Sequence, residues 1–83
     1  MSKKEIVVSD VEKEHDNPIA ELVQVACKFD SEIILESNNR KINAKSIMGM
    51  MSLKLQKGED VTIVADGQDE DAAVSGVATF LGA

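Results

Sequence analysis

The chain has 83 residues and a formal net charge of −6 at pH 7, with 43% hydrophobic but only 2% aromatic residues. This length suits a single domain over residues 1–83, and the acidity and scarcity of aromatic side chains argue against binding nucleic-acid backbones or stacked bases. One cysteine cannot form an intrachain disulfide and no apolar run spans a membrane, so we expect a cytoplasmic protein without membrane insertion.

The first elements are a strand and a helix. The β-branched run 5–8 predicts a strand, followed by a polar and acidic loop. The pair Asn17 and Pro18 is typical of a helix start, with Asp16 or Asn17 as the capping residue. Apolar residues then recur at helical spacing, which predicts a helix over 18–28.

The middle of the chain predicts a hairpin, a short helix and a further strand. Residues 32–36 and 40–43 read as strands joined by a turn at 37–39, where asparagine tolerates positive φ. Residues 46–53 predict a short helix. The clearest strand pattern covers 60–66, with alternate apolar residues on one face.

A last helix begins near residues 69–71, because acidic side chains in the first turn complement the helix dipole. We expect Asp69 and Asp71, like Glu21 in the earlier helix, to be solvated. We expect Gly76 to weaken this helix, because glycine costs about 1 kcal/mol against alanine in a helix interior. The expected inner stripe is Ala73, Val74, Val77 and Leu81.

The order of the elements is strand, helix, strand, strand, helix, strand, helix. The hairpin in the middle favours a mostly antiparallel sheet over a parallel one, with the helices on one face. The sequence therefore predicts an α+β domain of two layers.

The most informative segment is residues 43–53, with the sequence NAKSIMGMMSL. Ser46 stands where the short helix begins, so its hydroxyl can accept a backbone N–H as a cap. Phosphorylation would put a dianion where the helix dipole and free amides favour negative charge. Lys45 is adjacent, and the nearest acidic residues in the sequence are distant. The segment therefore predicts a phosphorylation switch at Ser46.

Large apolar side chains occupy the same short helix. Methionine is flexible and polarisable, so exposed methionines form an adaptable docking surface for proteins. The four-residue spacing of Ile47 and Met51 puts both on one face. We expect Ile47, Met48 and Met51 to bind partners, with Met50 and Leu53 in the core.

The element order and residues 43–53 closely resemble HPr, the phosphocarrier of the bacterial sugar phosphotransferase system, in its Gram-positive form. His15 shortly before Pro18 and the junction at residues 67–72 also match, and the resemblance covers nearly the whole chain. It implies an HPr-like open-faced β-sandwich, in which a four-stranded antiparallel sheet of order 1-4-2-3 carries three helices on one face.

The resemblance also implies two phosphorylation sites. In the family, a histidine at the start of the first helix takes phosphate from Enzyme I and passes it to sugar-specific IIA domains; its place in the motif is His15. A serine opening the second helix, here Ser46, is phosphorylated by HPr kinase/phosphorylase, and that form binds the catabolite-control repressor in carbon catabolite repression. The resemblance thus implies a protein that is not itself an enzyme and needs no cofactor.

The carrier motif departs from the family pattern of Gly-Ile/Leu-His-Ala-Arg-Pro-Ala. Asn17 stands in place of the arginine, Asp16 in place of a small neutral residue, and Glu14 in place of an apolar one. A lost guanidinium and two added carboxylates all oppose a phosphoryl group on His15. The residues that would form the phosphate environment are Asp16 and Asn17.

We therefore expect a regulatory phosphoacceptor switched at Ser46, with weakened carrier activity at His15. The alternative is a fully active phosphocarrier that passes phosphate from Enzyme I to IIA domains through His15. A third interpretation is an interaction domain that is not phosphorylated at all.

Metal and thiol chemistry are not indicated. The acidic residues Asp10, Glu12 and Glu14 near the histidine lack the glycine and terminal glutamate of a calcium loop, so no metal site is expected. Cys27 is expected to be partly buried on the helix surface and to have no chemical role.

Overall fold

The computed structural model describes residues 1–14, 16–37, 39–52 and 57–82. The predictions that concern His15 and Leu53 therefore lie outside the described residues.

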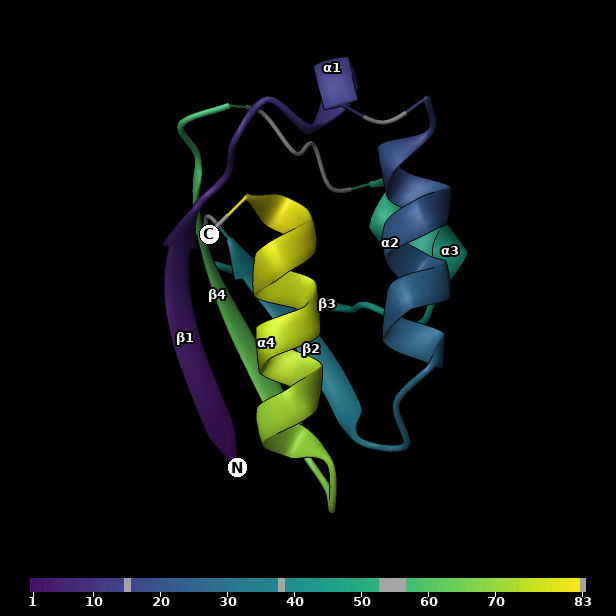
Figure 1. Cartoon of the computed structure of the whole chain (residues 1–83), viewed down its shortest axis with the longest axis vertical. Helices are drawn as coiled ribbons and strands as arrows, with labels where there is room; N and C mark the ends of the chain where they lie inside the picture. Colours follow the sequence, from purple (N-terminus) through teal and green to yellow (C-terminus); the bar gives the residue numbers. More distant parts are fainter. Residues whose placement is uncertain (15, 38, 53–56, 83) are drawn as a thin grey trace.

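One antiparallel sheet has the strand order β1-β4-β2-β3 (Figure 1). Its strands are β1 (Ser2–Val7), β2 (Glu32–Ser37), β3 (Arg40–Asn43) and β4 (Asp60–Asp66). This confirms the predicted sheet and its order. Strand β1 starts earlier than the β-branched run, because its charged residues 3–5 pair with β4 while their side chains remain exposed to water.

The helices lie on one face of this sheet (Figure 1). They are α2 (Pro18–Cys27), α3 (Ile47–Met51) and α4 (Glu70–Leu81), and α2 contacts both of the others. A one-turn helix, α1 (Val11–Glu14), lies within the predicted loop. The sequence did not predict this turn, which is anchored because the Val11 side chain is 1% exposed.

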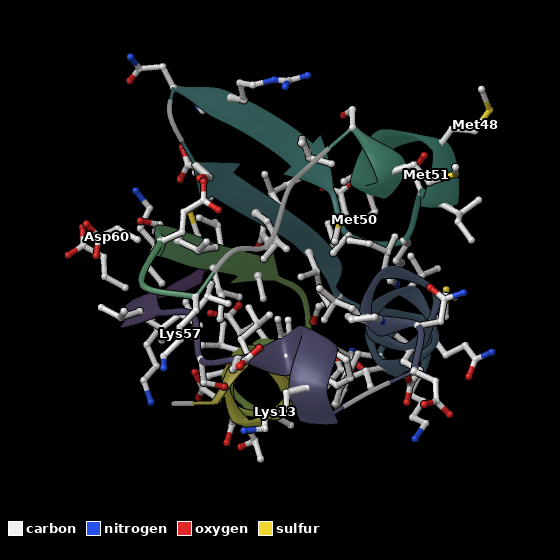
Figure 2. The ribbon with its side chains drawn as sticks, turned by 90° about the horizontal axis from the view of Figure 1, so that it is seen from above. Lys13, Met48, Met50, Met51, Lys57 and Asp60 are labelled. Atoms are coloured by element: carbon white, nitrogen blue, oxygen red, sulfur yellow. The ribbon has the colours of Figure 1, made fainter. Side chains whose placement is uncertain are left out.

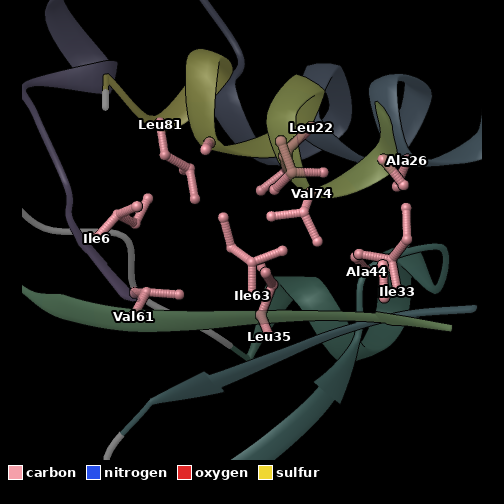
Figure 3. Close-up of a cluster of buried hydrophobic side chains, with 14 of the residues drawn as sticks. Ile6, Leu22, Ala26, Ile33, Leu35, Ala44, Val61, Ile63, Val74 and Leu81 are labelled. Carbon is pink, nitrogen blue, oxygen red and sulfur yellow. The ribbon is translucent and has the colours of Figure 1, made fainter. Parts of the chain in front are cut away.

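The core fills the space between sheet and helices (Figure 3). Alternate residues of β4 and β2 point toward the helices, as the period of two predicts. The predicted inner stripe of α4 is confirmed, because all four of its residues are buried. The buried side chains that the strands and helices contribute to this core include Ile33, Leu35, Val61, Ile63, Ala65, Leu22, Ala26, Val74 and Leu81.

Gly76 has a packing role in α4 that the sequence did not reveal. A Cβ atom at this position would lie 2.9 Å from Cζ of Phe29, closer than real Cβ contacts allow. The missing side chain lets the Phe29 ring lie against α4. The helix keeps its full length of 12 residues, so the conformational cost of glycine does not break it.

Asp69 is not simply a solvated residue at a helix start, as the sequence suggested. Its Oδ2 accepts the backbone N–H of Asp30 at 2.9 Å, and its Oδ1 accepts that of Ser31 at 2.9 Å and also the Ser31 hydroxyl. The hydroxyl bond, with the backbone bonds, holds the pKa of Asp69 below its ordinary value. Asp71 also has a partner, because it accepts the hydroxyl of Ser2. Asp69 thus ties the start of α4 to the chain entering β2.

Replacing Asp69 by Asn is expected to lower the urea midpoint of unfolding at pH 7. The wild-type protein is expected to have the larger free energy of unfolding at every pH above the ordinary aspartate pKa of about 3.9. This difference is lost as the pH falls through the lower pKa that Asp69 has in the folded protein. Urea unfolding from pH 7 to pH 2 measures this, with Asp60→Asn on the exposed end of β4 as the control. A difference from wild type that stays constant over this pH range would contradict the role of the charge.

Replacing Gly67 by Ala is expected to lower the free energy of unfolding by about 3 kcal/mol. About 1 kcal/mol comes from placing alanine at a positive φ, and about 1–3 kcal/mol comes from steric overlap of the added Cβ with Ser31. Its φ is +157°, and an added Cβ would lie 2.7 Å from the Cα of Ser31. Gly58→Ala is the matched control, because φ there is +87° and nothing lies within 4 Å of the added Cβ. Thermal or urea unfolding measures both, and equal losses would show that overlap with Ser31 is unimportant.

Candidate functional site

Ser46 is the N-cap of α3, as the sequence predicts. Its backbone is extended, with φ −98° and ψ 112°, and its Oγ accepts the N–H of Gly49 at 3.3 Å. Its carbonyl accepts the N–H of Met50 at 2.9 Å, which starts the helical bonding pattern. The Ser46 side chain is half-buried and lies at the end of the helix, so its hydroxyl is in the position that capping requires.

The turn before Ser46 is fixed by Asn43 and Lys45. Asn43 Oδ1 accepts the N–H of Lys45 at 2.9 Å, and the Asn43 carbonyl accepts the N–H of Ser46 at 3.0 Å. The Lys45 ammonium donates to the carbonyl of Phe29 at 2.6 Å, beyond the end of α2. Lys45 therefore fastens α3 to the end of α2, in addition to being the cation nearest Ser46 in sequence.

Three large apolar side chains of α3 face solvent, and we call them the α3 patch: Ile47, Met48 and Met51. Their exposed fractions are 49%, 83% and 72%, whereas Met50 is fully buried. Figure 2 shows Met48 and Met51 at the outer surface and Met50 turned inward. The predicted division of this helix between surface and core is therefore confirmed for Met50 and the α3 patch.

The start of α2 lies close to this patch. Asn17 is its N-cap, with Oδ1 accepting the N–H of Ala20 at 3.4 Å, and Pro18 is its first residue. Of the two capping residues that the sequence left open, Asn17 is therefore the right one and Asp16 is not. Asp16 is exposed just before the helix.

A groove of about 320 Å³ joins the start of α2 to the α3 patch. It is lined by Asn17, Ile19, Ala20, Ile47 and Met51. The sequence predicted Asn17, Ile47 and Met51 as site residues but missed Ile19 and Ala20. Ile19 read as part of the inner stripe of its helix, and only the packing of α3 beside α2 shows that it also borders this groove.

Other chemistry finds little support among the described residues. Within them, no three His, Cys, Asp or Glu side chains are grouped so that they could hold a metal ion. No helix in the described ranges combines the length and apolar content needed to cross a membrane. Cys27 is exposed instead of partly buried, because it follows Ala26 at the end of α2 and is turned away from the face that packs in the core.

Comparison with known proteins identifies the family. Residues 2–83 match the family model described as "PTS HPr component phosphorylation site". The HPr-like protein Crh of Bacillus subtilis (strain 168) is 45% identical over 64 residues, which cover 77% of this chain and 75% of Crh.

Solved structures agree with this match. HPr-C-His from Thermoanaerobacter tengcongensis superimposes with a TM-score of 0.88 at 40% identity, covering 98% of this chain and 91% of that one. The phosphocarrier protein HPr of Bacillus anthracis str. Ames gives a TM-score of 0.88 at 35% identity, covering 96% and 95%. HPr proteins carry phosphate and are not themselves enzymes. By its sequence and its fold, the chain belongs to the HPr family and is an HPr- or Crh-like protein of the phosphotransferase system.

Proposed function

We propose that this protein is a regulatory phosphoacceptor of the phosphotransferase system, switched at Ser46 and weakened as a carrier at His15. The observation that carries the proposal is the cap of α3: the Ser46 hydroxyl caps the same short helix that carries the exposed α3 patch. A change of charge at Ser46 therefore takes place at the edge of an apolar docking surface. The similarity to Crh supports a regulatory assignment.

The surroundings of Ser46 favour a phosphoryl group. The first turn of α3 contains no acidic residue, and the N–H of Gly49 already points at the Ser46 oxygen. A dianion at the start of a helix gains from the unbonded N–H groups and the helix dipole. HPr kinase/phosphorylase would add the phosphoryl group, and the catabolite-control repressor would bind the modified form through the α3 patch.

The surroundings of His15 disfavour the carrier reaction. Asn17 replaces the arginine of the family motif, and its side-chain oxygen is already bonded to the N–H of Ala20. Asp16 adds an exposed carboxylate in the residue after the histidine. At an effective dielectric near 20, unit charges about 4 Å apart interact by roughly 4 kcal/mol, which solvent and salt reduce. The carboxylate of Asp16 and the absence of an arginine at position 17 thus both disfavour a phosphoryl group on His15.

The alternative is a fully active phosphocarrier between Enzyme I and the IIA domains. Two features favour it: the carrier histidine is present in the sequence, and Pro18 opens α2 as the family motif requires. The groove between α2 and α3 would then receive an apolar side chain of either partner. The rate of phosphate transfer separates the two proposals.

We expect HPr kinase/phosphorylase with ATP to place one phosphoryl group on Ser46, detected by mass spectrometry of proteolytic fragments. Ser46→Ala is expected to abolish the modification. Ser52→Ala is the matched control at the other end of α3, where the hydroxyl donates to the carbonyl of Gly49, and it is expected to leave the modification intact. An unmodified Ser46, or modification at Ser52 alone, would count against the switch.

We expect Enzyme I to transfer labelled phosphate to the wild-type chain more slowly than to an ordinary HPr. The double variant Asp16→Ala with Asn17→Arg is expected to raise the rate by about ten- to a hundredfold, because a charge-assisted bond contributes about 1.5–3 kcal/mol. Gln24→Arg adds the same single positive charge as Asn17→Arg, but on an exposed part of α2, and serves as the control for that substitution. A wild-type rate equal to that of an ordinary HPr would support the alternative carrier function instead.

A further inference from the structure

Three of the chain's four methionines lie in α3, and they differ in their exposure to solvent. Met48 and Met51 face solvent, whereas Met50 between them is fully buried (Figure 2). The fourth, Met1, is as exposed as Met51 but precedes β1, at the opposite edge of the sheet from β3. The short helix therefore presents two thioether side chains on one turn and keeps a third in the core.

The surroundings of the two exposed thioethers are apolar. Met51 lines the groove between α2 and α3, whose other lining side chains are apolar apart from Asn17. Among the large apolar side chains of the described ranges, Met48 is the most exposed. A partner that fits this surface would remove water from both sulfurs. An oxygen atom added to either sulfur would then be buried without a donor from the α3 patch, which is unfavourable.

We propose that Met48 and Met51 are a modification site for peroxides, and that their oxidation to methionine sulfoxide weakens partner binding at the α3 patch without unfolding the domain. This rests on the proposed role of the α3 patch as a docking surface. Sulfoxide formation turns a flexible apolar side chain into a polar one, and reductases reverse it. Met50 keeps its thioether because it is buried, so the core keeps its packing.

The reaction needs only hydrogen peroxide and an accessible sulfur. The thioether sulfur donates an electron pair to one peroxide oxygen, so that the O–O bond breaks and an S–O bond forms. The departing hydroxide takes the proton of the transferred oxygen and leaves as water. The sulfur is oxidised and the peroxide is reduced. Because a thioether has no proton to lose, the step needs no neighbouring base, and the apolar α3 patch supplies none.

The first measurement maps oxidation by mass spectrometry of proteolytic fragments after limited treatment with hydrogen peroxide. In the folded protein, Met48 and Met51 are expected to oxidise about as fast as the exposed Met1 and at least about tenfold faster than Met50, because reaction follows exposure. In urea, all four are expected to react at similar rates. Oxidation of Met50 in the folded protein at the rate of its two neighbours would overturn the modification site.

The second measurement is the affinity of the Ser46-phosphorylated protein for the catabolite-control repressor before and after the same treatment. The wild-type affinity is expected to fall about tenfold and to recover after treatment with methionine sulfoxide reductases A and B. The double variant Met48→Leu with Met51→Leu keeps a similar apolar volume without sulfur, and its affinity is expected to be the same before and after treatment. Cys27→Ser removes the exposed thiol and is expected to respond as wild type does.

Three outcomes would overturn the peroxide control alone and leave the proposed function standing. They are a wild-type affinity that peroxide does not change, an equal loss in the double variant, and a loss that Cys27→Ser prevents. Circular dichroism of the treated protein is expected to match the untreated protein, and unfolding would also overturn the inference. If the untreated phosphorylated protein does not bind the repressor, the proposed function fails, and the oxidation map still decides the modification site.

Discussion

The site depends on the burial of one face of the β2–β4 strand pair. Ile33 and Leu35 of β2 and the alternate residues of β4 point to the same side, and only helices can cover them. The two long connections, β1 to β2 and β3 to β4, and the segment after β4 must therefore place their helices on that side. This brings α2 and α3 into contact and puts the starts of both helices at the edges of one groove. A one-residue slip in register would turn these side chains to the outer face and separate the two helix starts.

The starts of α2 and α3 differ in the charge of the group that holds them. α2 is held by an amide oxygen and by the carboxylate of Glu21, whereas α3 is held by the neutral hydroxyl of Ser46. Both arrangements bond N–H groups that would otherwise lack a partner. Of these three groups, only the serine hydroxyl can form a phosphate ester, and no carboxylate is bonded at its helix start. The start of α2 thus already holds a carboxylate, whereas the first turn of α3 contains no acidic residue.

The sequence predicts the strands, the helix starts and the surface residues of α3, because these depend on local patterns. The alternation of apolar residues is enough to predict the strand β4, and their helical spacing is enough to predict α4. A serine placed before an apolar helical run is likewise enough to predict the start of α3. The features that the sequence did not reveal depend on contacts between residues that lie far apart in the chain. Asp69 bonds to residues 30 and 31, Gly76 receives the Phe29 ring, and Ile19 borders the groove only because α3 lies beside α2. No local pattern contains the identity of such a distant neighbour.

The α3 patch and the start of α2 depend on different physical interactions. The α3 patch offers exposed apolar area, whose contribution to binding depends on dehydration and is insensitive to nearby carboxylates. A site for a phosphoryl group needs donors and positive charge, whereas the start of α2 has the exposed carboxylate of Asp16 and a backbone N–H already bonded to Glu21. Substitutions at the start of α2 can therefore change its charge while the exposed apolar area of α3 stays the same. A difference in how the two helix starts of this fold accommodate an anion therefore requires no change of fold, only a change of charge over one turn of helix.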